Sequence, residues 1–484
     1  MKSIGSPYTD ACPIATHLSR DATSDESITL IRSWLNDCTL DHRCPLNDDV
    51  ELPTRLVDLG MPDREMLRLY APEPGITGKY VALSYCWGKS QAFTATPKSI
   101  STQLRGFPLM SLPKTIQDAI RVTRGMGIRY LWVDSLCILQ GSDAVSQTDW
   151  KRESSRMESI YGNAYFTIAA TAASNGDEGF LHPRSCNLPF RIRSDSGVPI
   201  REGLITVAPS KISREWKDEP INTRGWTLQE RILSTRVISF SLHETTFLCD
   251  SSVVRDKTGV HQYWHKVYQG RAPPTHQNDL RNSSQSRIYE WDRLVMDYSA
   301  RDITKAREKL VAIGALAKRY HMVTGDEYLA GLWKSSLHTD LLWDRGDYVF
   351  SAFFPAPKQG KPRTYRAPSW SWASVDGMVS YIKAHGFRKS HWSRIELLEY
   401  RVKLADDNDP FGMVQNAYLV LRGRLKKFSS EGIKASTHLD TNNGAATGWK
   451  RLLWKQKIPE SVYIPVVVGV PGRAVEGMAV GLLL

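Results

Sequence analysis

The sequence lacks the features that mark secreted and membrane-spanning proteins. Its 484 residues include seven cysteines, an odd number at irregular spacing, whereas a secreted disulfide framework is usually short and rich in cysteine. The first thirty residues contain no continuous apolar segment of the kind that a secretory signal requires. No run of about 18 apolar residues is present, because prolines and charges interrupt the nearest candidate at 462–484. We therefore expect a cytoplasmic protein with no membrane span, whose thiols are free or act as ligands.

Several catalytic and nucleic-acid-binding signatures are missing as well. The chain has no Walker loop, no Gly-x-Gly-x-x-Gly fingerprint and no Gly-x-Ser-x-Gly elbow. Its formal net charge of +12 reflects 63 Lys and Arg against 51 Asp and Glu. These basic residues are scattered among acidic ones and form no stripe with interleaved aromatics, the pattern typical of nucleic-acid binding. We therefore expect no nucleic-acid partner.

The sequence does contain enough apolar material for more than one core. Hydrophobic residues make up 41% of the chain, including 15 Trp, which is too much for general disorder. A chain of this length exceeds one ordinary core, so two packed regions are expected. We predict an N-terminal segment over 1–50, an α/β domain over 51–255 and a C-terminal α+β region over 280–484, with a polar linker at 278–287.

Apolar segments alternate with helical patterns inside the predicted α/β domain. The strands are predicted at 79–87, 128–133 and 164–170, and the helices at 113–125 and 148–161. Nearly continuous apolar runs are typical of strands buried on both faces. Strand, helix, strand, helix, strand with short connections indicates a parallel sheet flanked by helices, an α/β fold of three layers.

Further elements are predicted on either side of this unit. They are a short helix at 28–35, two strands within 52–70 around a turn at Gly60, short strands over 191–207, a helix at 223–233, a hairpin of 236–240 with 245–249, a helix at 303–320 and an aromatic-rich element at 368–373. These predictions rest on the spacing of apolar residues within each segment and on the Gly and Pro residues that mark the turns between segments.

Four sequence blocks, in this order and spacing, carry a family resemblance. They are residues 80–88 (YVALSYCWG), 130–138 (YLWVDSLCI), 149–164 (which contains Trp150 and Glu153) and 224–231 (RGWTLQER). Together they resemble the fungal heterokaryon incompatibility (HET) domain, so the predicted domain over 51–255 is interpreted as a HET domain. Segments 328–333 and 366–377 look like the C-terminal halves that accompany it. The resemblance implies a role in fungal nonself recognition, in which incompatible cell fusion triggers programmed cell death.

The same resemblance implies a remote relationship to TIR domains, and so a three-layer fold of the TIR or flavodoxin kind. Leu83-Ser84-Tyr85 followed by Gly88 repeats the aliphatic–Leu–Ser–aromatic strand that opens a TIR domain before a Gly loop. TIR enzymes cleave NAD with a Glu that lies on a helix near a Trp. Two segments here fit that description, Trp150 with Glu153 and Trp226 with Glu230. The chain is thus a candidate NAD glycohydrolase, with NAD as substrate and no required cofactor.

The predicted nucleotide site lies where parallel strands end. Ligands of such sheets bind beyond the carboxyl ends of the strands, and the residues expected there are Ser84, Tyr85, Trp87, Gly88, Asp134 and Ser135. Glycosidic cleavage needs a carboxylate that orients the ribose and stabilises an oxocarbenium-like centre. Glu153 and Glu230 are the catalytic candidates. Both have structural alternatives, since Glu153 stands beside Lys151 and Arg152, and Glu230 near Arg224 and Arg231.

Other residues of this region have two interpretations each. Asp134 either orients a ribose hydroxyl or caps the turn after its strand. Trp87 is either an aromatic wall for a nicotinamide or adenine ring or a core side chain. Cys86 and Cys137 lie in apolar segments, where thiols are usually inert.

Cys38, His42 and Cys44 offer three metal-binding side chains within seven residues. A structural zinc site needs a fourth ligand, for which Cys12 and His17 are the candidates in this part of the chain. Because the spacing differs from the usual Cys-x-x-Cys knuckle, we assign no metal to the functional site.

Three functions of different classes fit the sequence. The first is a cell-death effector whose HET domain cleaves NAD or a related nucleotide. The second is a non-catalytic signalling module that works by self-association or with another incompatibility protein. The third is a HET-like protein recruited to a biosynthetic reaction of secondary metabolism.

Overall fold

The structure is a computed structural model, which describes residues 22, 24–42, 44–60, 65–88, 93–182, 219–242, 244–251, 253–255, 259–260, 284–345, 364–381, 396–422, 464–465 and 481–482. The chain divides into two compact units, Met1–Gln269 and Gly270–Leu484. The strands predicted over 191–207 and most of the linker predicted at 278–287 lie outside the described residues.

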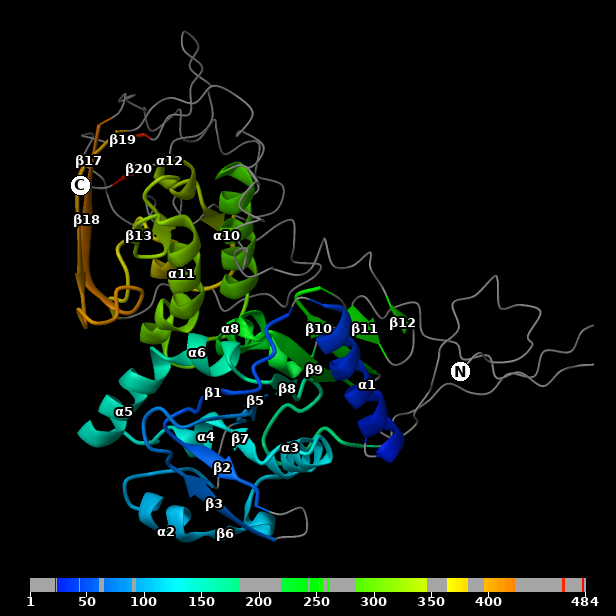
Figure 1. Cartoon of the computed structure of the whole chain (residues 1–484). Helices are drawn as coiled ribbons and strands as arrows, with labels where there is room; N and C mark the ends of the chain where they lie inside the picture. The colour runs from blue at the N-terminus through cyan, green and yellow to red at the C-terminus, as the bar shows by residue number, and fades with distance from the viewer. Residues whose placement is uncertain are drawn as a thin grey trace, which may run out of the picture. The chain divides into compact units, whose positions relative to one another are not determined.

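The first unit is built on a mixed sheet, drawn from blue to green in Figure 1. Ten strands of the described residues form it in the order β12-β11-β10-β9-β8-β5-β7-β2-β3-β6. Their bounds are β2 Leu56–Asp58, β3 Met66–Tyr70, β5 Tyr80–Ser84, β6 Phe107–Pro108, β7 Tyr130–Trp132, β8 Phe166–Ala169, β9 Arg236–Phe240, β10 Thr245–Cys249, β11 Val253–Arg255 and β12 Gly259–Val260. A separate ribbon pairs β1 (Val50–Glu51) with β4 (Thr77–Gly78).

The centre of the sheet is parallel, as the sequence predicts. Strand β5 lies between β7 and β8 and runs parallel to both. Every residue of β5 and of β8 is buried, which explains why their sequences are continuous apolar runs rather than alternating ones. The three-strand core of the prediction is therefore confirmed.

Outside this centre the sheet departs from the prediction of a purely parallel one. Strand β2 pairs antiparallel with both β7 and β3, as the predicted turn at Gly60 requires. On the other side β9 runs parallel to β8, and it also forms the predicted antiparallel hairpin with β10. The sheet is mixed because hairpin partners extend a parallel centre at both edges.

Helices and short 3₁₀ turns complete the first unit. They are α1 Asp25–Asp41, α2 Ile100–Arg105, η1 Leu109–Ser111, α3 Lys114–Gly125, α4 Asp134–Cys137, α5 Ala144–Ser154, α6 Met157–Gly162, η2 Pro220–Thr223 and α8 Trp226–Leu233. Helix α3 packs on β5 and β7 through the predicted apolar face, which includes Ile116 and Ile120. Helix α8 also packs on β5, and this contact brings its side chains to the middle of the sheet.

Two predicted helices have different bounds in the structure. The helix expected at 28–35 is the longer α1, because Ser24 caps its N-terminus by accepting a hydrogen bond from the backbone N–H of Ser27. The helix expected at 148–161 is broken at Ser155 and Arg156 into α5 and α6. Helix α4 also separates β7 from α5, so α5 does not follow the strand directly as expected.

The second unit has an aromatic core between two helices, α10 Ser284–Ser299 and α11 Val311–Thr324. The Trp333 ring stacks on Tyr320 with centroids 4.3 Å apart, and Trp291 meets Trp333 edge-on at 5.2 Å. Around them lie η4 Ala306–Glu308, α12 Leu337–Asp340, η5 Trp372–Ser374 and four two-stranded ribbons, β13 Tyr328–Leu329 with β14 Leu332–Trp333, β15 Asp344–Arg345 with β16 Val379–Ser380, β17 Glu396–Leu404 with β18 Val414–Arg422, and β19 Ile464–Pro465 with β20 Gly481–Leu482.

The sequence placed two boundaries of this unit wrongly. Helix α10 begins at Ser284, inside the segment whose polar sequence predicted a linker. Helix α11 begins at Val311 rather than at Ile303, after the η4 turn. None of the helices in the described ranges is long and apolar enough to cross a membrane.

Candidate functional site

The site is built where the parallel strands end. Ser84 is the last residue of β5, and it pairs in register with Ala169 of β8. The backbone N–H of Ala170 donates to the Ser84 carbonyl at 3.0 Å. Asp134 follows β7 after one residue and begins α4. Ser84, Asp134 and Ala170 therefore lie at one end of the sheet, as predicted from the alternation of strands and helices.

Helix α8 brings Glu230 to this end of the sheet. The Ser84 hydroxyl donates to Oε2 of Glu230 in a short hydrogen bond between buried groups. Beside it, the buried Tyr161 of α6 donates its hydroxyl to the Leu83 carbonyl at 3.2 Å. A carboxylate from a segment well beyond the three-strand core is thus held against the last residue of the central strand.

Asp134 is held by donors from two directions. The Trp87 indole donates its Nε1–H to Oδ2 at 2.7 Å, and the Ser135 backbone N–H donates to Oδ1 at 2.7 Å. The Tyr85 hydroxyl in turn donates to Oγ of Ser135 at 2.9 Å. The predicted residues Tyr85, Trp87, Asp134 and Ser135 therefore form one hydrogen-bonded group.

Both carboxyl groups have a raised pKa, and Asp134 contributes to the rise of Glu230. Burial, reinforced by the charge of Asp134, raises the pKa of Glu230 to about 7, while the Ser84 hydrogen bond and the Arg224 cation oppose that rise. Burial also raises the pKa of Asp134 to about 6, against the lowering effect of its bonds to Trp87 and Ser135 and of Arg224. Such raised values in paired carboxyls are typical of functional sites, because a structural ion pair would favour the charged form.

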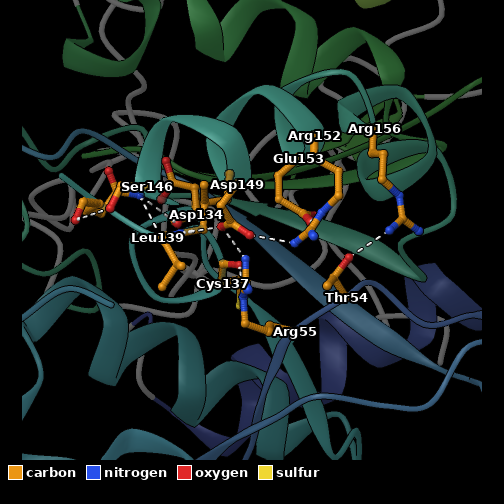
Figure 2. Close-up of polar contacts among 12 residues, drawn as sticks. Thr54, Arg55, Asp134, Cys137, Leu139, Ser146, Asp149, Arg152, Glu153 and Arg156 are labelled. Atoms are coloured by element: carbon orange, nitrogen blue, oxygen red, sulfur yellow. Dashed lines mark hydrogen bonds and ion pairs between the residues drawn. The ribbon is translucent and has the colours of Figure 1, made fainter. Parts of the chain in front are cut away.

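Glu153 belongs to a different set of contacts. Its Oε1 accepts from Nε of Arg152 at 2.9 Å, and Arg152 also reaches Asp149 of the same helix (Figure 2). Asp149 pairs with Arg55 and accepts from the Leu139 backbone N–H at 2.8 Å. This network ties α5 to the segments before β2 and after α4.

The ion pair with Arg152 is the structural alternative that the sequence offered for Glu153. With 1% of its surface exposed, Glu153 is a core group and not a surface one. The two Trp–Glu segments nonetheless meet, since the Trp150 and Trp226 rings contact edge-to-face with centroids 6.1 Å apart. Of the two glutamates, Glu230 is the one hydrogen-bonded to a predicted site residue.

Gly88, a residue of the predicted site, has a backbone conformation that favours glycine. Its φ of +81° lies in the left-handed region, and a Cβ at this position would stand 2.6 Å from Cβ of Asn175. The loop after β5 therefore packs directly on the segment after β8. Trp87 precedes this turn and keeps partial exposure.

The thiols near the site are poor nucleophiles. Burial raises the pKa of Cys86 to about 11 and that of Cys137 to about 12. Both side chains are almost fully buried, at 3% and 1% exposed. Neither cysteine has the lowered pKa that a reactive thiol needs, in agreement with the sequence interpretation.

Tyr161 and Arg224 take part in the site without having been predicted for it. Both stand in the blocks that carry the family resemblance, Tyr161 on α6 and Arg224 just before α8. The sequence suggested Arg224 solely as an ion-pair partner of Glu230. The hydrogen-bond partner of Tyr161 is Leu83 of β5, which is far from Tyr161 in the sequence.

The family comparison agrees with the resemblance. A model of the family described as heterokaryon incompatibility protein (HET) matches residues 80–230. No curated protein and no solved structure matches the chain. The matched range begins with β5 and ends at Glu230, so it contains Asp134, Ser84 and the carboxylate to which Ser84 donates. Residues 80–230 of the chain therefore match the HET domain.

Proposed function

We propose that this protein is a fungal nonself-recognition effector that triggers cell death by cleaving the glycosidic bond of NAD or a related nucleotide, with Glu230 as the catalytic carboxylate. The observation that carries the proposal is the hydrogen bond from Ser84 to Glu230 at the end of the central parallel strand. The match of residues 80–230 to the HET family model supports involvement in heterokaryon incompatibility.

The order of the parallel strands supports a nucleotide as the ligand. The strands β7-β5-β8-β9 are all parallel, and numbered along the chain from β5 they run 2-1-3-4. This is the beginning of the flavodoxin-like order, in which the ligand lies at the switch point between the first and third strands. In this protein the switch point falls between β5 and β8, beside Ser84.

Cleavage of the glycosidic bond of NAD requires mainly a negative charge that is held close to the ribose. As the bond between C1′ of the ribose and the nicotinamide nitrogen breaks, the electron pair leaves with nicotinamide and positive charge develops on the sugar. An ionised Glu230 stabilises that charge and orients the ribose hydroxyls. Water then adds to C1′, and its proton passes to a carboxylate.

The surroundings of Glu230 support this role. Glu230 is 5% exposed, so its charge acts in a medium that screens it weakly. Asp134, Trp87 and Arg224 are each partly exposed, and the charges of Asp134 and Arg224 both act on the ionisation of Glu230. Of these partly exposed residues, Trp87 offers an aromatic ring for a base, and Arg224 a cation for a phosphate.

Expression in a fungal host tests the function. We expect the wild-type chain to deplete NAD and kill the cells, and Glu230→Gln, which keeps the shape of the side chain, to do neither. Glu153→Gln is the matched control, because it removes an equally buried carboxylate that is bonded to Arg152 instead of Ser84. Killing by Glu230→Gln with undiminished NAD would reject the catalytic proposal and favour the self-associating module.

A further inference from the structure

Four metal-binding side chains meet in a part of the first unit that the proposed function does not use. Sγ of Cys38, Cys44 and Cys249 and a ring nitrogen of His42 all lie within 4.8 Å of one another. Sγ of Cys249 lies 3.3 Å from Nδ1 of His42. The cysteines are buried and the histidine is partly exposed.

The local fold explains why the first three of these residues converge. Cys38 is in the last turn of α1, and His42 is the C-cap residue, whose backbone N–H donates to the Cys38 carbonyl at 3.2 Å. The chain leaves the helix at His42 in an extended conformation, which brings Cys44 back to the helix end. Cys249 is the last residue of β10. It is the fourth side chain, while the candidates Cys12 and His17 lie outside the described residues.

A buried cation beside the cluster calls for negative charge there. Arg236 is 0% exposed, and its Nε donates to Sγ of Cys38 at 3.3 Å. Its Nη1 reaches the carbonyls of Leu46 and Tyr165 at 3.4 Å, and no ion pair joins it to a carboxylate of the described residues. A guanidinium is costly to bury without an opposite charge. Neutral thiols do not supply that charge, whereas thiolates do.

We propose that Cys38, His42 through Nδ1, Cys44 and Cys249 bind one structural Zn²⁺ ion. Three thiolates and one imidazole form a common tetrahedral zinc set, in which sulfur atoms stand about 3.8 Å apart for Zn–S bonds of about 2.3 Å. The three thiolates and the ion carry a net charge of −1, which the Arg236 guanidinium neutralises. The hydrogen bond that Nε of Arg236 donates to Sγ of Cys38 would hold this ligand in its orientation.

The position of the ligands indicates what the ion does. They stand before and after the HET match at 80–230, so the metal joins the two chain segments that flank the domain. It fixes the C-terminal end of α1 to the end of β10, alongside the contact between the Trp34 and Phe247 rings at 6.3 Å. Because four protein side chains fill a tetrahedral set, the site is structural and leaves no position for a substrate.

Metal analysis of the purified full-length chain, prepared without a metal-affinity step, tests this site. We expect about one zinc per chain, and less than about a tenth of that in Cys249→Ser. Cys137→Ser is the matched control, since it removes an equally buried thiol outside the cluster and should keep the zinc. A metal-chelating agent should lower the melting temperature of wild type and of Cys137→Ser.

Cobalt supplies a readout that does not depend on how well a variant folds. Wild type reconstituted with Co²⁺ should show thiolate-to-cobalt charge-transfer absorption and the visible bands of a tetrahedral ion. Wild type without zinc and without these bands would overturn the proposal, as would a disulfide between any two of the three cysteines in the native protein. Full zinc content in Cys249→Ser would also overturn it.

Discussion

The hydroxyl of Ser84 donates to the carboxylate of Glu230 across 146 residues of sequence. This bond joins the end of the central parallel strand to the helix that follows η2, and it lies beside the switch point of the strand order. Because the hydrogen bond favours the charged form of Glu230, it opposes the effect of burial on the same group. Ser84 therefore tunes the ionisation of Glu230.

The first prediction concerns the dependence of nicotinamide release on pH. The pKa of Glu230 is raised to about 7, so release that needs the ionised carboxylate should increase as pH rises through about 7 and then level off. Ser84→Ala removes a contact that lowers this pKa, and its profile should shift to higher pH. Initial rates between pH 5 and 9 measure both profiles. An unchanged midpoint in Ser84→Ala would argue against Glu230 as the titrating group.

The second prediction concerns stability. The pKa of Glu230 is higher in the folded chain than in the unfolded one, so its contribution is complete below about pH 4.5 and is lost as pH rises through about 7. Glu230→Gln lacks this loss and can still accept the Ser84 hydrogen bond. Relative to wild type, the variant should gain about 2–3 kcal/mol of unfolding free energy between pH 5 and pH 8. Urea unfolding of both proteins at pH 5 and at pH 8 measures this gain. An equal difference between variant and wild type at the two pH values would contradict the raised pKa of Glu230.

A third prediction compares two glycines with similar backbones. Gly88 has a φ of +81° and Gly75 a φ of +84°. A Cβ added at Gly88 would clash with Asn175, whereas a Cβ added at Gly75 would have no atom within 4 Å. Alanine at either position costs about 1 kcal/mol for the left-handed backbone. Gly88→Ala should lose more stability than Gly75→Ala, and it alone should reduce nicotinamide release, because it displaces the loop that carries Trp87. Equal effects of the two variants would show that the close packing of Gly88 on Asn175 matters neither for stability nor for nicotinamide release.

A fourth prediction separates the two interpretations of Trp87. Phenylalanine keeps a ring but removes the N–H that donates to Asp134, so Trp87→Phe should raise the pKa of Asp134. Since Trp87 is partly exposed, we expect weaker nucleotide binding and little change in melting temperature. Calorimetric titration with NAD and a thermal melt measure the two quantities. Unchanged binding with a lowered melting temperature would make Trp87 a core residue.

The centre of the fold could be predicted from local sequence because its signals are local. An apolar run such as Tyr80–Ser84 can be recognised without knowledge of its neighbours, and so can the positive φ of Gly88 after it. The break between α5 and α6 was missed because Ser155 and Arg156 are ordinary helix residues and nothing in the pattern marks them.

The pairing of distant segments could not be predicted. The sequence named both Glu153 and Glu230, but the choice between them depends on which one reaches Ser84, and that depends on the parallel pairing of β9 with β8. The same reason applies to Cys249, which joins Cys38, His42 and Cys44 through the end of β10. Both clusters require contacts that span most of the first unit.

The most direct test of the account is nicotinamide release from NAD by the purified full-length chain, followed with and without crowding agents that promote association. We predict release by wild type and by Glu153→Gln, and a loss of about 100-fold or more in Glu230→Gln, a typical cost of removing a group that stabilises transition-state charge. Release by Glu230→Gln at the wild-type rate, or no release by wild type under either condition, would contradict it.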